Sequence, residues 1–153
     1  MAERLSAGDV CTRSVAFACK THSIGEAARL MREHHVGSLV VVEEAEPGRV
    51  VVGMLTDRDI VTGVVAKGVD PESLRVEDLM GADLVSARED DSVIDLLAVM
   101  RRKGVRRIPV VDAQGVLVGL AALDDLLEVI AEELNLVAQA IESGRKREPT
   151  RRP

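Results

Sequence analysis

Two segments of the chain, 69 positions apart, carry apolar residues at the spacing of one helix face. In each segment the apolar positions recur at i, i+3, i+4 and i+7: Ile24, Ala27, Ala28 and Met31 in the first, and Val93, Leu96, Leu97 and Met100 in the second. Each segment starts with a serine followed three positions later by an acidic residue, as in a helix capping box: Ser23 with Glu26, and Ser92 with Asp95. The pattern therefore predicts two equivalent amphipathic helices within an internal repeat.

Short apolar strands follow each predicted helix and extend the repeat. Residues 36–42 (VGSLVVV) align with residues 105–111 (VRRIPVV) at the same offset of 69. Further along the offset falls to 66, so that residues 52–56 (VGMLT) match residues 118–122 (VGLAA). The difference lies in the connection between two strands, which is where turn residues and insertions are tolerated. The repeated unit is a short strand, a capped helix, a strand, a hairpin turn, a strand and a helix.

The repeat predicts an α/β (α+β) fold of two tandem units, each with a short three-stranded sheet and two helices, related by pseudo-twofold symmetry. We expect the first unit over 6–69, a linker over 70–77, the second unit with an extended C-terminal helix over 78–143, and a basic, disordered tail over 144–153. The linker opens with Asp70-Pro71, which places proline at its favoured first position of a short helix.

Composition and charge narrow the function classes. The net charge of −6 and the single aromatic residue, Phe17, argue against a nucleic-acid surface, because single strands are held by stacking on aromatic side chains. No apolar run approaches the roughly 18 residues that a membrane span needs, and no signal segment is recognisable, so we expect a cytoplasmic protein. No Ser-His-Asp or Cys-His arrangement and no Gly-rich phosphate loop is present, so we predict no enzyme.

The cysteines and the paired histidines predict little chemistry. Cys11 and Cys19 are eight positions apart, which is neither a C-x-x-C pair nor a zinc knuckle. Two buried thiols in a reducing cytosol is the first interpretation, and a disulfide or redox sensor is the alternative. His34 and His35 are neighbours at a helix end and point about 100° apart, so they are poorly placed to chelate one metal ion. We expect no metal site.

The stretch 53–60 (GMLTDRDI) carries the candidate chemistry. It has the pattern of a strand end, a sharp turn and the first turn of a helix. Thr56 and Asp59 then lie on one side of that first turn, beside free backbone N–H groups and the positive end of the helix dipole. The pair can cap the helix, or the carboxylate can accept from sugar hydroxyls while the hydroxyl and N–H groups meet an anion. These residues alone leave both interpretations open.

The two copies, with their capped helices, V-x-x-(hydrophobic)-x-V-V strands and G-x-x-(T)-x-x-D corners, resemble the CBS domain, of which a tandem pair is called a Bateman module. The resemblance covers about residues 6–135. The run 54–61 (MLTDRDIV) and the G-x-D-P linker that follows are similar to stand-alone actinobacterial pairs of the hypoxic response protein type. The resemblance implies a regulatory sensor without catalytic activity. It also implies an adenosyl ligand (AMP, ADP, ATP or S-adenosylmethionine) in clefts between the copies.

Carried over residue by residue, the resemblance implies a first cleft built around Asp59, which would bind the ribose hydroxyls. Thr56 would hold the ribose or the first phosphate. The adenine slot would be lined by Met54, Val85 and Ala87, and the remaining residues of this cleft would be Asp57, Arg106, Arg107 and Pro109. The two arginines match phosphate-binding positions of the family, with solvated strand-edge charges as the alternative. The resemblance thus implies that this cleft is the stronger one.

The second cleft departs from the family pattern. Its residues would be Gly37, Ser38, Leu120, Ala122 and Asp125. Ala122 stands where the first copy has a threonine, and Gly37 and Ser38 stand where the second copy has two arginines. We therefore expect this cleft to bind weakly, to bind an uncharged nucleoside, or to stay empty.

The last predicted helix, about residues 124–143, carries more apolar side chains than one unit needs: Leu126, Leu127, Val129, Ile130, Leu134, Val137 and Ile141. The surplus either covers the core or forms a seam between subunits, and we expect the seam and hence a homodimer. For the basic tail we expect a flexible end, with contact to RNA or to an acidic partner as the alternative.

The rival function is a nucleotide-independent scaffold that contacts an unidentified protein partner. Stabilisation by a nucleotide separates the two functions.

Overall fold

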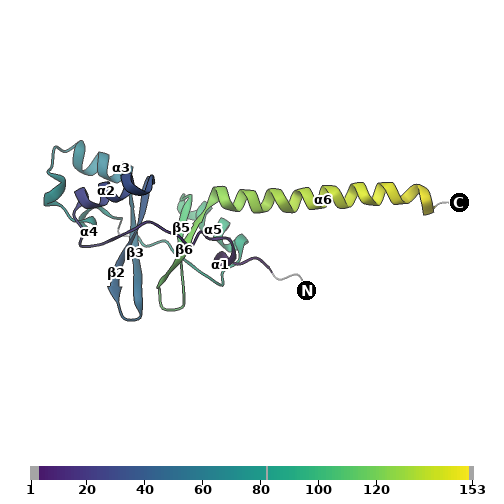
Figure 1. Ribbon diagram of the computed structural model, residues 1–153, viewed down its shortest axis with the longest axis horizontal. Coiled ribbons are helices and arrows are strands. Elements are labelled where there is room, and N and C mark those ends of the chain that lie inside the picture. Colours follow the sequence, from purple (N-terminus) through teal and green to yellow (C-terminus); the bar gives the residue numbers. More distant parts are fainter. Residues whose placement is uncertain (1–3, 82, 152–153) are drawn as a thin grey trace.

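Two three-stranded sheets of the same topology form the body of the computed structural model, which describes residues 4–81 and 83–151 (Figure 1). The first sheet has the order β1 (Phe17–Cys19), β2 (Ser38–Ala45), β3 (Gly48–Thr56). The second has the order β4 (Ala87–Arg88), β5 (Arg107–Val111), β6 (Leu117–Ala122). In each, the first pair is parallel and the second pair is an antiparallel hairpin. The predicted fold class is confirmed.

The two amphipathic helices form where the repeat predicts them, as α2 (Ile24–His34) and α5 (Val93–Lys103). Both open with the expected capping box, Ser23 with Glu26 and Ser92 with Asp95. Both end on a residue in the left-handed conformation. That residue is Gly104 in α5 (φ 65°), where glycine costs nothing, and His35 in α2 (φ 54°).

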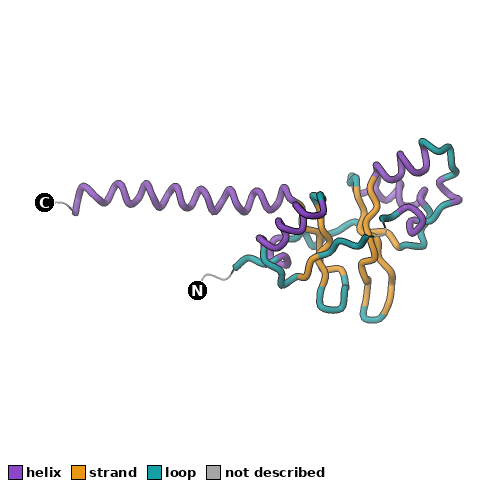
Figure 2. Tube along the Cα trace, turned by 180° about the vertical axis from the view of Figure 1, so that it is seen from behind, coloured by secondary structure: helices purple, strands orange, loops and turns teal. Residues whose placement is uncertain are grey.

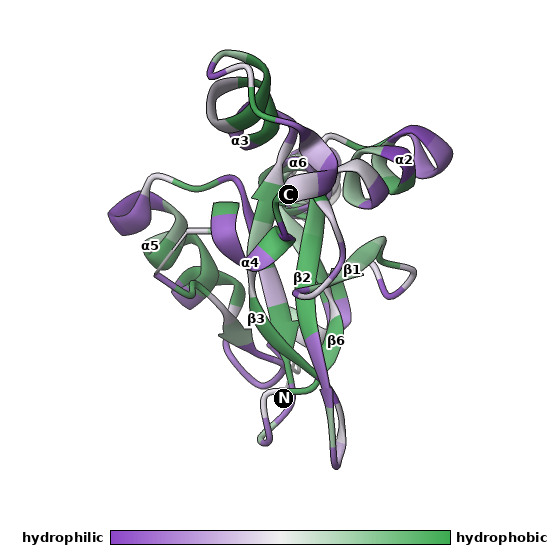
Figure 3. Cartoon of the chain, turned by 90° about the vertical axis from the view of Figure 1, so that its left-hand side faces the viewer, coloured by the Kyte–Doolittle hydropathy of each residue, from purple (hydrophilic) through white to green (hydrophobic). Residues whose placement is uncertain are grey.

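Residues 39–42 of strand β2, one leucine and three valines, are buried on both faces of the sheet. One face, with Leu39 and Val41, packs under α2 in the first core. The other face, with Val40 and Val42, packs with Val51 and Val111 in a cluster that joins the two sheets. Because side chains alternate along a strand, one apolar run serves both layers. Figure 3 shows this concentration of hydrophobic residues on the strands, with hydrophilic residues along the outer helices and hairpin turns.

The opening helix of each copy packs on the other copy. Helix α1 (Ala7–Val10) packs on the second copy, where the Ala7 N–H donates to the Asp91 carbonyl oxygen at 2.7 Å. Helix α4 (Val76–Leu79) packs on the first copy, where the Val76 N–H donates to the His22 carbonyl oxygen at 2.8 Å. Ala7 and Val76 are fully buried, each in the core of the opposite copy. The two copies are therefore intertwined.

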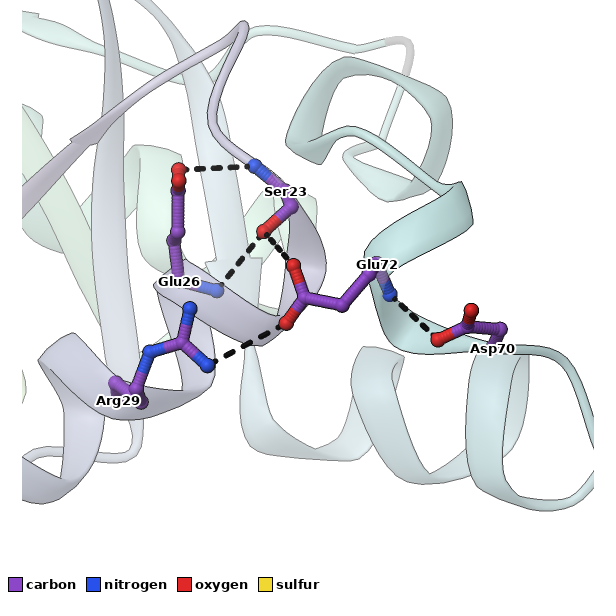
Figure 4. A network of polar contacts seen from close by, with 5 residues as sticks. All are labelled: Ser23, Glu26, Arg29, Asp70 and Glu72. Carbon is purple, nitrogen blue, oxygen red and sulfur yellow. Dashed lines mark hydrogen bonds and ion pairs between the residues drawn. The ribbon is translucent and has the colours of Figure 1, made fainter.

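The connection between the copies is held against helix α2 (Figure 4). After α3 (Asp57–Ile60) and a π-helical turn, η1 (Val61–Val65), comes the predicted linker helix η2 (Pro71–Ser73), capped by Asp70. The Glu72 carboxylate accepts a hydrogen bond from the Ser23 hydroxyl at 2.9 Å and pairs with Arg29 at 3.3 Å. The linker is thereby held against the first turn of α2.

Helix α6 (Leu123–Arg151) leaves the body and projects away from both sheets (Figures 1 and 2). The disordered tail expected from residue 144 is wrong for residues 144–151, which continue this helix. Residues 145–148 are good helix formers, and extending an existing helix adds one hydrogen bond for each residue fixed except at Pro149, which has no N–H group. Within the described residues, no helix combines the length and the apolar content that crossing a bilayer requires.

Gly119 lets the segment after α1 cross strand β6. Thr12 and Leu120 exchange two backbone hydrogen bonds of 2.9 Å, and a Cβ at Gly119 would lie 2.7 Å from the Thr12 carbonyl oxygen. Gly119→Ala should lower the free energy of unfolding by about 1–3 kcal/mol in urea denaturation. Gly53→Ala, at the equivalent position, meets only the flexible Met80 side chain at 3.1 Å and should cost less. Equal effects would contradict this account of the crossing.

Candidate functional site

Two cavities lie at equivalent positions between the copies. The wide cleft, about 310 Å³, is lined by Thr12, Ser14, Val15, Ala16, His35, Val36, Gly37, Ser38, Arg107, Leu120, Ala122 and Asp125. The narrow cleft, about 120 Å³, is lined by Gly53, Met54, Gly81, Asp83, Leu84, Val85, Val105 and Arg107. The repeat offsets relate the two linings, for example Ala16 to Val85 and Leu120 to Met54. The fold therefore builds the same corner twice.

The wide cleft contains all five residues assigned from the sequence to the second cleft: Gly37, Ser38, Leu120, Ala122 and Asp125. The expectation that this cleft has neither arginine is wrong, because Arg107 also lines it. Arg107 opens strand β5 and pairs with Ala122 of β6, which brings its side chain to the cleft that Ala122 lines. The cleft thus holds a cation as well as a carboxylate.

The two adjacent arginines have different surroundings. Within the described part of the chain, nothing gives the Arg107 guanidinium a hydrogen bond or an ion pair, and it lines both clefts. Arg106 lies outside both clefts and pairs with Asp124 at 3.7 Å, with side chains 77% and 80% exposed. Both arginines line a neighbouring cavity of about 170 Å³ with Ala122 and Asp124, but Arg106 reaches neither the wide nor the narrow cleft. Only Arg107 is therefore placed to meet a ligand in either cleft.

The two candidate ribose acceptors also differ. Asp59 is engaged in a capping box: its carboxylate accepts from the Thr56 N–H at 2.9 Å, and the Thr56 hydroxyl accepts from the Asp59 N–H at 3.2 Å. Asp125 has Ala122 in the position of Thr56, and among the described residues no hydrogen bond or ion pair engages its carboxylate. The capping interpretation of Thr56 and Asp59 is thus realised, whereas the Asp125 oxygens are available.

The narrow cleft gathers fewer of the residues assigned to it. Met54, Val85 and Arg107 line it. Asp57 instead lies beside Gly37, just before strand β2, and its backbone N–H donates to the Gly37 carbonyl oxygen at 2.9 Å. Ala87 and Pro109 are buried within the second sheet.

Bulkier side chains account for the smaller volume of this cleft. Arg107 stands where the wide cleft has Ser38, and Leu84 stands where it has Val15. The remaining residues assigned from the sequence to this cleft, Thr56, Asp59 and Arg106, do not line it.

Sequence reasoning missed three polar residues of the wide cleft, Thr12, Ser14 and His35. The repeat offset was available as an indication, since Val85 of the first assigned cleft corresponds to Ala16, two residues after Ser14. His35 reaches the cleft because α2 ends there in a left-handed turn, which no spacing rule predicts for histidine.

The cysteine thiols and the carboxylate of Asp9 give no indication of a further reactive site in the described residues. Burial raises the pKa of the Cys11 thiol, which keeps it protonated and weakly nucleophilic. Both cysteines are free. Backbone and side-chain hydrogen bonds from Ser6 hold the pKa of Asp9 below its ordinary value, at the exposed start of α1. No group of three or more His, Cys, Asp or Glu side chains that could hold a metal ion occurs in the described ranges.

Comparison with known proteins identifies the family to which this architecture belongs. The family model of the CBS domain matches twice, over residues 7–66 and 76–132. The CBS domain-containing protein YhcV of Bacillus subtilis is 41% identical over 121 residues, which cover 79% of this chain and 82% of YhcV. Hypoxic response protein 1 of Mycobacterium tuberculosis is 31% identical over 127 residues, 83% of this chain and 86% of that protein.

Two solved structures are similar in fold. The crystal structure of Hypoxic Response Protein I with two coordinated zinc ions has a TM-score of 0.71 at 31% identity, covering 80% of this chain and 97% of that one. The cytosolic domain of the Mg²⁺ channel MgtE in complex with ATP has a TM-score of 0.70 at 27% identity, covering 83% of this chain and 49% of that one. The resemblance to a stand-alone tandem CBS pair is confirmed.

The different surroundings of the two aspartates predict different costs in stability. Asp59→Ala removes the acceptor for the Thr56 N–H and should lower the free energy of unfolding by about 1 kcal/mol. Asp125→Ala, at the equivalent helix start, removes no such hydrogen bond and should cost less. Thermal and urea unfolding of both variants without ligand measures the difference. A larger loss in Asp125→Ala would show that its carboxylate has a structural role.

Proposed function

The chain belongs to the CBS-domain family, and on this premise we propose that it is a regulatory module that binds an adenine nucleotide in its wide cleft and catalyses no reaction. One observation supports this most: Arg107 and Asp125, whose guanidinium and carboxylate have no partner among the described residues, line the same cavity of about 310 Å³. That volume lies within the range of about 300–1,000 Å³ typical of ligand pockets. A related fold, the cytosolic domain of MgtE, is known in complex with ATP.

Each part of the wide cleft suits one part of such a ligand. The Asp125 carboxylate can accept hydrogen bonds from the two ribose hydroxyls. The Arg107 guanidinium can donate two parallel hydrogen bonds to a phosphate, which is the geometry that arginine favours. Val15, Ala16 and Leu120 offer apolar surface for the base. The hydroxyl groups of Ser14 and Ser38 add neutral donors beside the phosphate.

The narrow cleft is the alternative site. Occupation there requires its cavity of about 120 Å³ to widen, and it requires the Asp59 carboxylate to serve a ribose while it still caps helix α3. Arg107 borders both cavities. A phosphate that pairs with Arg107 in one cleft therefore leaves the other cleft without this cation. We propose on these grounds that the wide cleft binds first and more tightly, opposite to the order implied by the family pattern.

Ligand binding would act on the relation between the copies. The wall of the wide cleft comes partly from residues 12–38 of the first copy and partly from residues 107–125 of the second. A nucleotide between them adds contacts to both copies at once, and it favours whichever spacing of the copies those contacts require. A change of spacing is the signal that a partner protein would read.

Isothermal titration calorimetry with ATP and AMP tests the assignment of the ribose acceptor. Asp125→Ala should weaken binding by about ten- to a hundredfold, because a hydrogen bond to a charged group contributes about 1.5–3 kcal/mol. Asp59→Ala is the matched control and should leave the affinity of the wide cleft nearly unchanged. The reverse order would place the tighter site in the narrow cleft. No binding by the wild type would favour the nucleotide-independent scaffold.

The phosphate partner is tested by comparing two neighbouring arginines. Arg107→Ala should weaken ATP more than adenosine, and the difference should shrink at high salt because the interaction is between charges at the surface. Arg106→Ala removes an equal charge that is already paired with Asp124, and it should change ATP affinity little. If both variants lose ATP affinity equally, a diffuse positive potential attracts the nucleotide and Arg107 makes no specific contact.

A further inference from the structure

Helix α6 carries an apolar surface that the body does not cover. Its first turns pack on the second core, where Leu126 is fully buried and Val129 and Ile130 are half-buried. From residue 131 to residue 147 every side chain is exposed, including Leu134 (65%), Leu136 (64%) and Ile141 (53%). Figures 1 and 2 show this part of the helix extending alone beyond both sheets. A row of exposed large apolar side chains marks a surface for another molecule.

The spacing of this surface identifies the kind of partner. Five residues, which we call the seam, are separated by alternating steps of three and four: Leu127, Ile130, Leu134, Val137 and Ile141. Steps of three and four average 3.5 residues, the period at which one helix packs along another in a coiled coil. Of the seam residues near the body, Ile130 is half-buried, whereas Leu127 is 64% exposed. A second helix is therefore the occupant that the pattern fits.

The charges along α6 indicate which helix this is and how it is directed. The start of the helix is acidic, with Asp124, Asp125 and Glu128, and residues 145–147 near its end are all basic. In a parallel pair of identical helices, each charged end would face its own copy. In an antiparallel pair, each basic end lies near the acidic start of the other helix, and the helix dipoles are also opposed. Near the middle, Glu132 lies on the side of the helix opposite the hydrophobic stripe and Glu133 lies at its border, so neither favours one direction strongly.

We propose that α6 forms an antiparallel coiled coil with α6 of a second copy of this chain. In this arrangement residue 132 lies at the centre, and each layer pairs a seam residue with the complementary one on the other chain: Leu127 with Val137, and Ile130 with Leu134. The two bodies then lie at opposite ends of the paired helices. The proposal goes beyond the nucleotide site and does not depend on it.

Sedimentation equilibrium on the full chain tests whether the helices associate. It compares substitutions of two leucines whose exposed fractions are nearly equal, Leu134 and Leu136. Leu134→Glu places a charge in the seam of both chains, and it should weaken the dimer by at least about a hundredfold. Leu136→Glu makes the same change on the opposite side of the helix, outside the seam, and should leave the dimer intact. Circular dichroism of both variants should show a folded body, because neither side chain packs on it. A monomeric wild type, or equal effects of the two variants, would overturn the proposal.

Disulfide cross-linking tests the direction of the helices. An oxidised mixture of Leu127→Cys and Val137→Cys chains should give mixed dimers on a non-reducing gel, with the wild type as a control for Cys11 and Cys19. Either variant alone should give none, because residues 127 of the two chains lie about 15 Å apart along the axis when the helices are antiparallel. Cross-linking of Leu127→Cys with itself would show a parallel pair and overturn the antiparallel assignment.

Discussion

The exchange of opening helices between the two copies is the constraint on which the rest of the molecule depends. Ala7 completes the core of the second copy and Val76 completes the core of the first, so neither core closes without the other half of the chain. The crossing segment must then pass over β6 at Gly119, where a side chain has no room. The cooperative unit is therefore the pair of copies.

The same exchange creates the two clefts and explains why they differ. Each cleft is bounded by a crossing segment and a strand end, which the repeat supplies twice. The first turn of α6 also lines the wide cleft, whereas no described residue of α3 lines the narrow one. One substitution pair then breaks the symmetry, because Ser38 leaves room in the wide cleft whereas Arg107 occupies the equivalent place in the narrow one. A second difference, Ala122 for Thr56, leaves the Asp125 carboxylate outside a capping box. Small changes in a duplicated frame thus give two cavities of different volume and charge.

Much of the fold could be predicted from the sequence because periodicity and capping are local properties. The helices at 24–34 and 93–103, their serine caps and the paired hairpins all follow from spacing. The exchange of α1 and α4 could not be predicted, since four-residue helices carry too little pattern to show which core they enter. All five residues predicted for the second cleft line the wide cavity, but only Met54, Val85 and Arg107 of the nine predicted for the first line the narrow one. The placement of Arg107 in both cavities was missed. That placement depends on where a long side chain extends, and sequence offsets do not encode it.

Backbone amide chemical shifts during a titration with ATP test the central claim most directly, because they report the occupied cleft without any substitution. The wide-cleft site predicts that the first and largest shifts occur at Gly37, Ser38 and Ala122, with smaller changes at Gly53 and Met54. Shifts that begin at Gly53, Met54 and Thr56 while Ser38 and Ala122 stay unchanged would contradict the account, and would place the nucleotide in the narrow cleft.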